Sequence, residues 1–104
     1  MSWKLVWSAK AERKLLEYTG WLADRNPEAA LRFVDTLEAD VAGLADHPLL
    51  APVWDAYPRQ AVRRLLSGSY LVYNEVREGT QEVYILTVRH ARERPPLEDD
   101  VRSD

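Results

Sequence analysis

The chain contains no cysteine, and this absence excludes both a disulfide framework and a thiolate nucleophile. Its apolar runs are short, and none approaches the roughly 18 consecutive apolar residues of a membrane-spanning helix. The first residues also lack the apolar core of a secretory signal peptide. Because disulfides are rare in the reducing cytosol, the missing cysteines fit that compartment. We therefore expect a cytoplasmic protein with no membrane partner.

Histidine is scarce as well, since the chain has only His47 and His90. Without cysteine, and without two histidines one helical turn apart, the sequence has no zinc-binding pattern, so we expect no metal site. A glycine-rich phosphate-binding loop is also missing. We expect a protein that works without a cofactor.

Lysine is confined to the first fourteen residues, and every later cation is an arginine. The net charge of −3 hides a sorted distribution, because residues 59–94 carry seven Arg and four Glu while the segments on either side are acidic. Guanidinium groups bind carboxylates and phosphates through paired hydrogen bonds. The arginine-rich segment is therefore a candidate binding surface, although for any single arginine a solvated strand face is the alternative.

Length and composition favour one small domain. A chain of 104 residues, of which 46% are hydrophobic, can fill a single core. We assign residues 1–96 to this domain. Residues 97–104 follow two prolines and form a short acidic tail, which we expect to be mobile.

Hydrophobic spacing predicts a strand followed by two helices. Apolar residues alternate over residues 3–7, as they do in a strand. Ser8 suits the N-cap of a helix that starts at Ala9, and Asn26 with Pro27 suits the start of a second helix that runs to about residue 45. Both segments are amphipathic, so we expect them to form an antiparallel hairpin.

Residues 46–60 hold three prolines and no regular period, which predicts a loop that Trp54 and Tyr57 anchor to the body. Strands are expected at residues 61–66, 70–77 and 82–90, joined by short turns that contain glycine. The last strand is apolar on both faces, so it belongs in the centre of the sheet. The fold class is α+β in the order βααβββ, with the N-terminal strand and with the helical hairpin packed on one face of an antiparallel sheet. The other face would be open to a partner.

Several short motifs in this order resemble the RelE/ParE toxin superfamily, and within it most closely ParE, also known as the plasmid stabilisation proteins. Each motif alone is common, and it is their ordered set that carries the resemblance. They are Trp7-Ser8, Asn26-Pro27-Glu28-Ala29-Ala30, Val62-Arg63, Tyr70, Tyr73, and the closing strand from Val83 to His90 with Arg92 and Arg94.

The resemblance implies the toxin component of a bacterial type II toxin–antitoxin system, which causes growth arrest. A ParE-like toxin would be a DNA gyrase inhibitor that acts by binding, and a cognate ParD-like antitoxin would neutralise it. A RelE-like toxin would instead be a ribosome-dependent mRNA endonuclease, with the ribosome and mRNA as partners. The third alternative is an inactive binding module. We expect the chain to be oligomeric only as a toxin–antitoxin complex or as a weak dimer.

A nuclease site is chemically conceivable in these residues. Cleavage of RNA through its 2′-hydroxyl needs a base, an acid and cations around the phosphate. His90, Arg63 and Tyr73 would take these roles. However, no lysine follows residue 14 and the net charge is negative, whereas binding to the ribosome favours a basic protein. The sequence therefore favours a protein target and no catalytic residue, with His90 as a structural group or a partner contact.

Under this binding interpretation, eight residues are candidates for contact with the antitoxin or the target: Arg63, Arg64, Tyr73, His90, Arg92, Arg94, Trp21 and Trp54. Arg63 and Arg64 should face opposite sides of the sheet, and we expect one of them to pair with a helix acid. Trp21 lies beside the apolar stripe of its helix, so it is either an edge of the core or an interface anchor.

Overall fold

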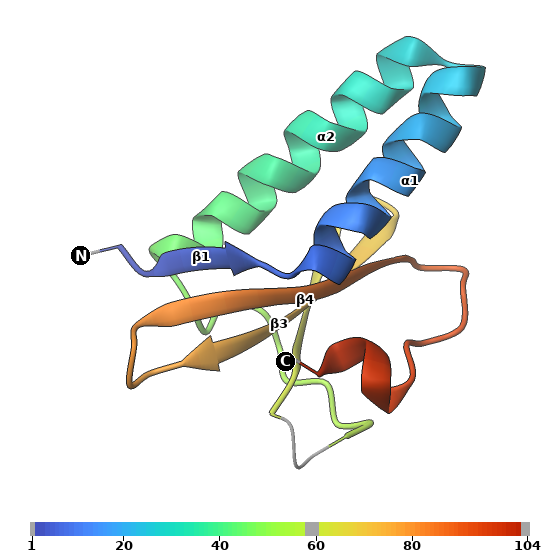
Figure 1. Cartoon of the computed structure of the whole chain (residues 1–104). Coiled ribbons are helices and arrows are strands. Elements are labelled where there is room, and N and C mark those ends of the chain that lie inside the picture. The colour runs from blue at the N-terminus through green and yellow to red at the C-terminus, as the bar shows by residue number, and fades with distance from the viewer. Residues whose placement is uncertain (1, 58–60, 103–104) are drawn as a thin grey trace.

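In the computed structural model, which describes residues 2–57 and 61–102, a helical hairpin lies on one face of a four-stranded sheet (Figure 1). The expected order βααβββ is confirmed. The elements are β1 (Lys4–Trp7), α1 (Ala9–Arg25), α2 (Pro27–Ala42), the 3₁₀ turn η1 (Gly43–Ala45), β2 (Arg63–Ser67), β3 (Tyr70–Arg77), β4 (Glu82–His90) and the 3₁₀ turn η3 (Glu98–Val101). Within the described residues, no helix is both long and apolar enough to span a bilayer.

The strands lie in the order β1-β4-β3-β2, so β4 is central, as its apolar composition predicted. β2, β3 and β4 form the expected antiparallel meander. β1, however, pairs with β4 in parallel, so the sheet is mixed and not antiparallel throughout. A parallel pair requires a long crossover connection, and here the helical hairpin and two strands separate β1 from β4 in the chain.

Both helix starts are capped as the sequence predicted. The Ser8 hydroxyl accepts a hydrogen bond from the Ala11 N–H at 2.9 Å and donates one to the Leu86 carbonyl at 2.8 Å. Asn26 accepts from the Ala29 N–H at 3.2 Å, and Pro27 occupies the first helical position. Ser8 therefore starts α1 and also fixes it to the central strand. α2 ends at Ala42, and η1 continues the chain to residue 45.

Two clusters of buried side chains lie on opposite faces of the sheet. The larger cluster fills the space between the helices and the sheet and includes Leu37, Val41, Leu44, Val72, Val83, Ile85 and Val88. The smaller one lies on the second face and consists of Val62, Tyr73, Leu86 and Val101, with Trp54 and Tyr57 packed against it. Trp54 and Tyr57 therefore anchor the loop, as expected.

The second face is thus partly covered by this chain itself, which corrects the expectation of an open face. η3 lies on the side of the sheet away from the helices (Figure 1), and its Val101 is fully buried. Mobility was therefore the wrong expectation for residues 98–101, while residues 103 and 104 of the tail lie outside the described residues. The strand expected at residues 61–66 is found at Arg63–Ser67, and Ala61 before it has a left-handed backbone with φ of 49°.

Candidate functional site

The three residues of the conceivable nuclease site do not come together. Tyr73 lies on the second face of the sheet, where it is 1% exposed and its ring is 4.8 Å from that of Trp54. The His90 ring instead contacts Tyr70, on the helix side, with 5.0 Å between ring centroids. Arg63 is aligned through β3 with Ile85, five residues before His90 along β4, which corresponds to roughly 17 Å.

Arg63 and Arg64 have different surroundings. The Arg63 guanidinium donates to the Ala51 carbonyl at 2.8 Å and to the Leu49 carbonyl at 3.4 Å, so it holds the loop before β2. Arg64 is aligned with Tyr73 and is half-buried. Within the described residues neither arginine forms an ion pair with a helix acid, so that expectation was wrong. Arg63 satisfies loop carbonyls instead.

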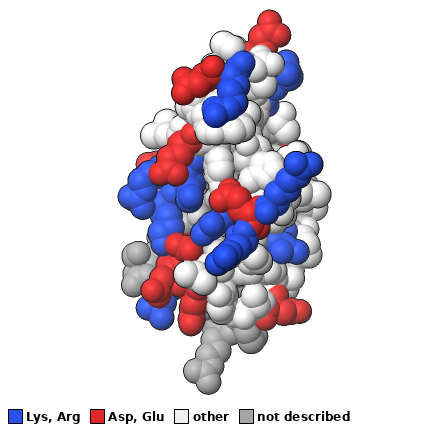
Figure 2. All heavy atoms as spheres, turned by 90° about the vertical axis from the view of Figure 1, so that its right-hand side faces the viewer, with Lys and Arg blue, Asp and Glu red and all other residues white. Residues whose placement is uncertain are grey.

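Arg92 and Arg94 are exposed on the segment that follows β4. Figure 2 shows the end of the molecule on which this segment lies, with Lys and Arg side chains across its middle and acidic side chains among them. The surface is therefore mixed in charge and not uniformly basic. Such a surface suits a protein partner better than the phosphate backbone of a nucleic acid, which favours a continuous basic patch.

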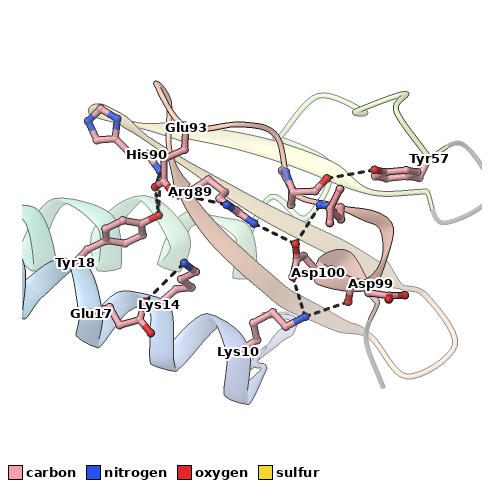
Figure 3. A network of polar contacts seen from close by, with 12 residues as sticks. Lys10, Lys14, Glu17, Tyr18, Tyr57, Arg89, His90, Glu93, Asp99 and Asp100 are labelled. Carbon is pink, nitrogen blue, oxygen red and sulfur yellow. Dashed lines mark hydrogen bonds and ion pairs between the residues drawn. The ribbon is translucent and has the colours of Figure 1, made fainter.

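A polar cluster fixes the end of β4 to α1 (Figure 3). The Tyr18 hydroxyl donates a short hydrogen bond to Glu93. The His90 N–H lies 3.1 Å from the same Glu93 oxygen and 3.3 Å from the Tyr18 hydroxyl oxygen. The Nδ1 atom of His90 accepts the Arg92 N–H at 3.1 Å. These bonds give His90 a structural role in shaping the turn that carries Arg92.

Two ionisable groups of this cluster, Tyr18 and Glu93, have shifted pKa values. Burial and the hydrogen bond to Glu93 raise the pKa of Tyr18, so its hydroxyl stays protonated. Burial raises the pKa of Glu93 too, but the hydrogen bonds from Tyr18 and His90 and the charges of Lys14 and Arg89 outweigh it and lower that pKa. Glu93 is therefore an ionised acceptor.

Trp21 stands at the edge of the same cluster. It lines a hollow of about 340 Å³ together with Glu17, Tyr18, Tyr70, His90 and Glu93. Its side chain is 55% exposed, and the Arg25 guanidinium stacks over the ring at 3.8 Å from the centroid. Trp21 is thus exposed at the edge of this cluster, and its role as an interface anchor stays a prediction.

A second polar cluster attaches η3 to the domain (Figure 3). Asp100 forms ion pairs with Arg89 of β4 at 3.1 Å and with Lys10 of α1 at 3.3 Å. It also accepts the Leu97 N–H at 3.1 Å. Neither cluster was predicted from the sequence, because Tyr18 fits the core stripe of its helix. The α1 partners of Glu93 and Asp100, which are Tyr18 and Lys10, also lie 75 and 90 positions away in the chain.

A larger hollow of about 490 Å³ runs between β1 and the helical hairpin. Its apolar lining comes from Leu5 and Trp7 of β1, Leu15 and Leu16 of α1, and Val41 of α2, with Glu12 and Glu38 beside them. Within the described residues there is no cluster of His, Asp or Glu side chains that could hold a metal ion.

Residues 5–95 match the family model described as the ParE toxin of the type II toxin–antitoxin system parDE. A chain in the structure of the chromosomal ParDE system from P. aeruginosa is similar, with a TM-score of 0.74 and 22% identity over 88% of this chain and 98% of that chain. No curated protein matches the chain.

Two solved structures on the RelE side share the fold as well. A chain of the Mycobacterium tuberculosis RelBE2 toxin–antitoxin complex has a TM-score of 0.61 and 18% identity, covering 86% of this chain and 99% of that chain. A double arginine-to-alanine mutant of E. coli RelE in the free state has a TM-score of 0.58 and 14% identity, covering 88% and 86%. The family model spans most of the present sequence, so the chain belongs to the ParE toxin family of type II toxin–antitoxin systems.

Proposed function

We propose that this toxin acts by binding DNA gyrase and inhibiting it, without cutting a substrate, and that a ParD-like antitoxin neutralises it. The observation that carries the proposal is the separation of Tyr73 from His90, because a buried tyrosine and a histidine on opposite faces of one sheet do not form an acid–base pair. The exposed Arg92, Arg94 and Trp21 are the residues we assign to contact with the target or the antitoxin.

Purified gyrase provides the test. Supercoiling of a relaxed plasmid should fall as the toxin is added. The His90→Ala variant should still inhibit, because no catalytic step depends on His90, although losing its hydrogen bond to the Arg92 N–H should weaken the inhibition. Replacing both Arg92 and Arg94 by Glu should weaken inhibition at least tenfold, while the same reversal at Arg32, which is exposed on α2, serves as the control. Normal supercoiling at saturating toxin would refute gyrase as the target.

A parallel reaction with translating ribosomes tests the alternative function, in which the protein is a RelE-like nuclease that cleaves mRNA on the ribosome. We expect the bound mRNA to remain intact. Cleavage that His90→Ala abolishes would establish a nuclease and overturn the proposal that the toxin acts by binding alone.

A further inference from the structure

The hollow of about 340 Å³ at Trp21 is lined mainly by aromatic rings, and the segment after β4 that forms one side of it carries two exposed arginines. We propose that this hollow receives an aromatic side chain from an acidic segment of the target protein, and that carboxylates of that segment pair with Arg92 and Arg94. The proposal rests on the proposed function only in naming gyrase as the protein that supplies the segment.

The first argument is the aromatic lining. Tyr70 is 9% exposed and is the most deeply buried residue of the lining, and the ring centroids of Tyr18 and His90 each lie 5.0 Å from its own. The ring planes meet Tyr70 at 63° and 83°, so the lining offers ring faces as well as ring edges. Trp21 leaves 55% of its surface in water at the rim. An incoming aromatic ring would cover that surface and stack or pack edge-on against the others.

The second argument is that the two carboxylates of the lining already have cationic partners. Glu17 pairs with Lys14 at 3.6 Å, and Glu93 pairs with Arg89 at 3.7 Å (Figure 3). The hollow therefore has no excess negative charge that would attract a cation. A neutral ring suits it better than a lysine or arginine side chain.

The third argument is the positive charge beside the hollow. Arg92 and Arg94 flank Glu93 in the chain, both are exposed, and neither forms an ion pair within the part of the chain that the structure describes. The hydrogen bond from the Arg92 N–H to His90 holds this segment against the hollow. Acidic residues next to the incoming ring would pair with both guanidinium groups, so the partner segment is acidic.

A single-stranded nucleic acid also combines aromatic rings with negative charge. Its phosphates, however, would lie close to Glu17 and Glu93 when a base enters the hollow, and these carboxylates repel them. A protein segment carries its negative charge only where its acidic side chains are placed. The lining therefore favours a protein over a nucleic acid.

Blocked five-residue peptides provide the probe, and the first has one phenylalanine between two pairs of glutamates. A second peptide has alanine in place of the phenylalanine, and a third has lysines in place of the glutamates. Binding is followed by NMR titration of the Trp21 indole N–H signal. The first peptide should bind at least tenfold more tightly than either of the others. In the variant Arg92→Glu with Arg94→Glu, the lysine peptide should become the tighter ligand.

The matched control is Arg13→Glu with Arg32→Glu, which reverses two exposed helix arginines that do not line the hollow. It should keep the wild-type preference. Equal binding of the three peptides, or no binding at millimolar concentration, would overturn the proposal. Tighter binding of a hexathymidine oligonucleotide would assign the hollow to a nucleic acid, and concentration-dependent shifts of the Trp21 signal without ligand would assign it to a second copy of the chain. Either result would also overturn the proposal.

A supercoiling reaction separates this proposal from the proposed function. The phenylalanine peptide at saturating concentration should relieve gyrase inhibition by the wild-type toxin, whereas the alanine peptide should not. Inhibition that the bound phenylalanine peptide fails to relieve would overturn the assignment of the hollow to gyrase. A toxin that binds this peptide with the expected preference but leaves gyrase active would instead refute the proposed function alone.

Discussion

Gln81 closes the turn between β3 and β4 with a φ of 54°, a left-handed conformation that disfavours a residue with a Cβ atom. The side chain is exposed. Gln81→Gly should therefore raise the free energy of unfolding by about 0.5–1 kcal/mol, measured by urea denaturation. Thr80→Gly, at the preceding residue without a positive φ, should give no such gain. Equal gains from the two substitutions would contradict the role of backbone strain.

Thr87 is buried in the centre of the sheet, and its hydroxyl oxygen has no hydrogen-bond partner among the described residues. A buried hydroxyl without a partner carries an uncompensated desolvation cost, and valine has nearly the same shape. Thr87→Val should stabilise the fold by about 1 kcal/mol, as judged by the shift of the thermal midpoint in calorimetry. Thr19→Val is the comparison, because the Thr19 hydroxyl donates to the Leu15 carbonyl. A midpoint that drops in Thr87→Val would show that the hydroxyl is satisfied.

Single residues differ in how far the sequence predicted their roles. Ser8 and Asn26 were predicted as helix caps, because a cap bonds to a backbone group three residues away. Tyr73 was expected at a partner surface, yet Trp54 covers it, and that contact joins a loop without a regular period to the sheet. Local hydrogen bonds leave a sequence signature, whereas the covering of one side chain by a distant one does not.

At the scale of elements, the attachment of η3 to the domain depends on the charge of Asp100, which pairs with Lys10 and Arg89. Burial raises the pKa of Asp100, but the hydrogen bonds from Leu97 and Lys10 and the charges of Lys10 and Arg89 outweigh burial and leave that pKa below its ordinary value. A carboxylate with a lowered folded pKa stabilises the fold above its unfolded pKa of 3.8, and this contribution is lost as the pH falls through the folded pKa.

Asp100→Asn should therefore lower stability at neutral pH and make the loss of stability below about pH 4 less steep. Asp99→Asn is the matched control, since the Asp99 side chain is 83% exposed and pairs only with the nearby Arg102 among the described ion pairs. Urea midpoints from pH 7 to pH 3 provide the measurement. Identical pH profiles for Asp100→Asn and wild type would show that these ion pairs contribute nothing to stability.

The same element shows where sequence reasoning fails. The helices were predicted because their apolar spacing and caps are local. η3 was not predicted because Asp100 pairs with Lys10, ninety positions earlier, and no local sequence pattern predicts such a contact. The mixed sheet was missed for a related reason, since the pairing of β1 with β4 joins the two ends of the fold.

For the whole molecule, the mixed surface charge and the separation of Tyr73 from His90 favour a protein that binds other proteins. Basic and acidic side chains are mixed on the side of the molecule that Figure 2 shows, and Tyr73 and His90 belong to different faces of the sheet. The family and fold followed from the order of elements and motifs, whereas the identity of the target depends on surface residues whose pattern has no fixed period. Binding without catalysis is the claim on which the proposed function depends.

The most direct measurement is the superhelical density of a reporter plasmid recovered from cells that express the toxin alone, with total mRNA integrity recorded from the same culture. We predict a relaxed plasmid and intact mRNA, and His90→Ala should still relax the plasmid and leave the mRNA intact. Co-expression of the cognate antitoxin should restore normal supercoiling. Normally supercoiled plasmid together with fragmented mRNA would contradict the account.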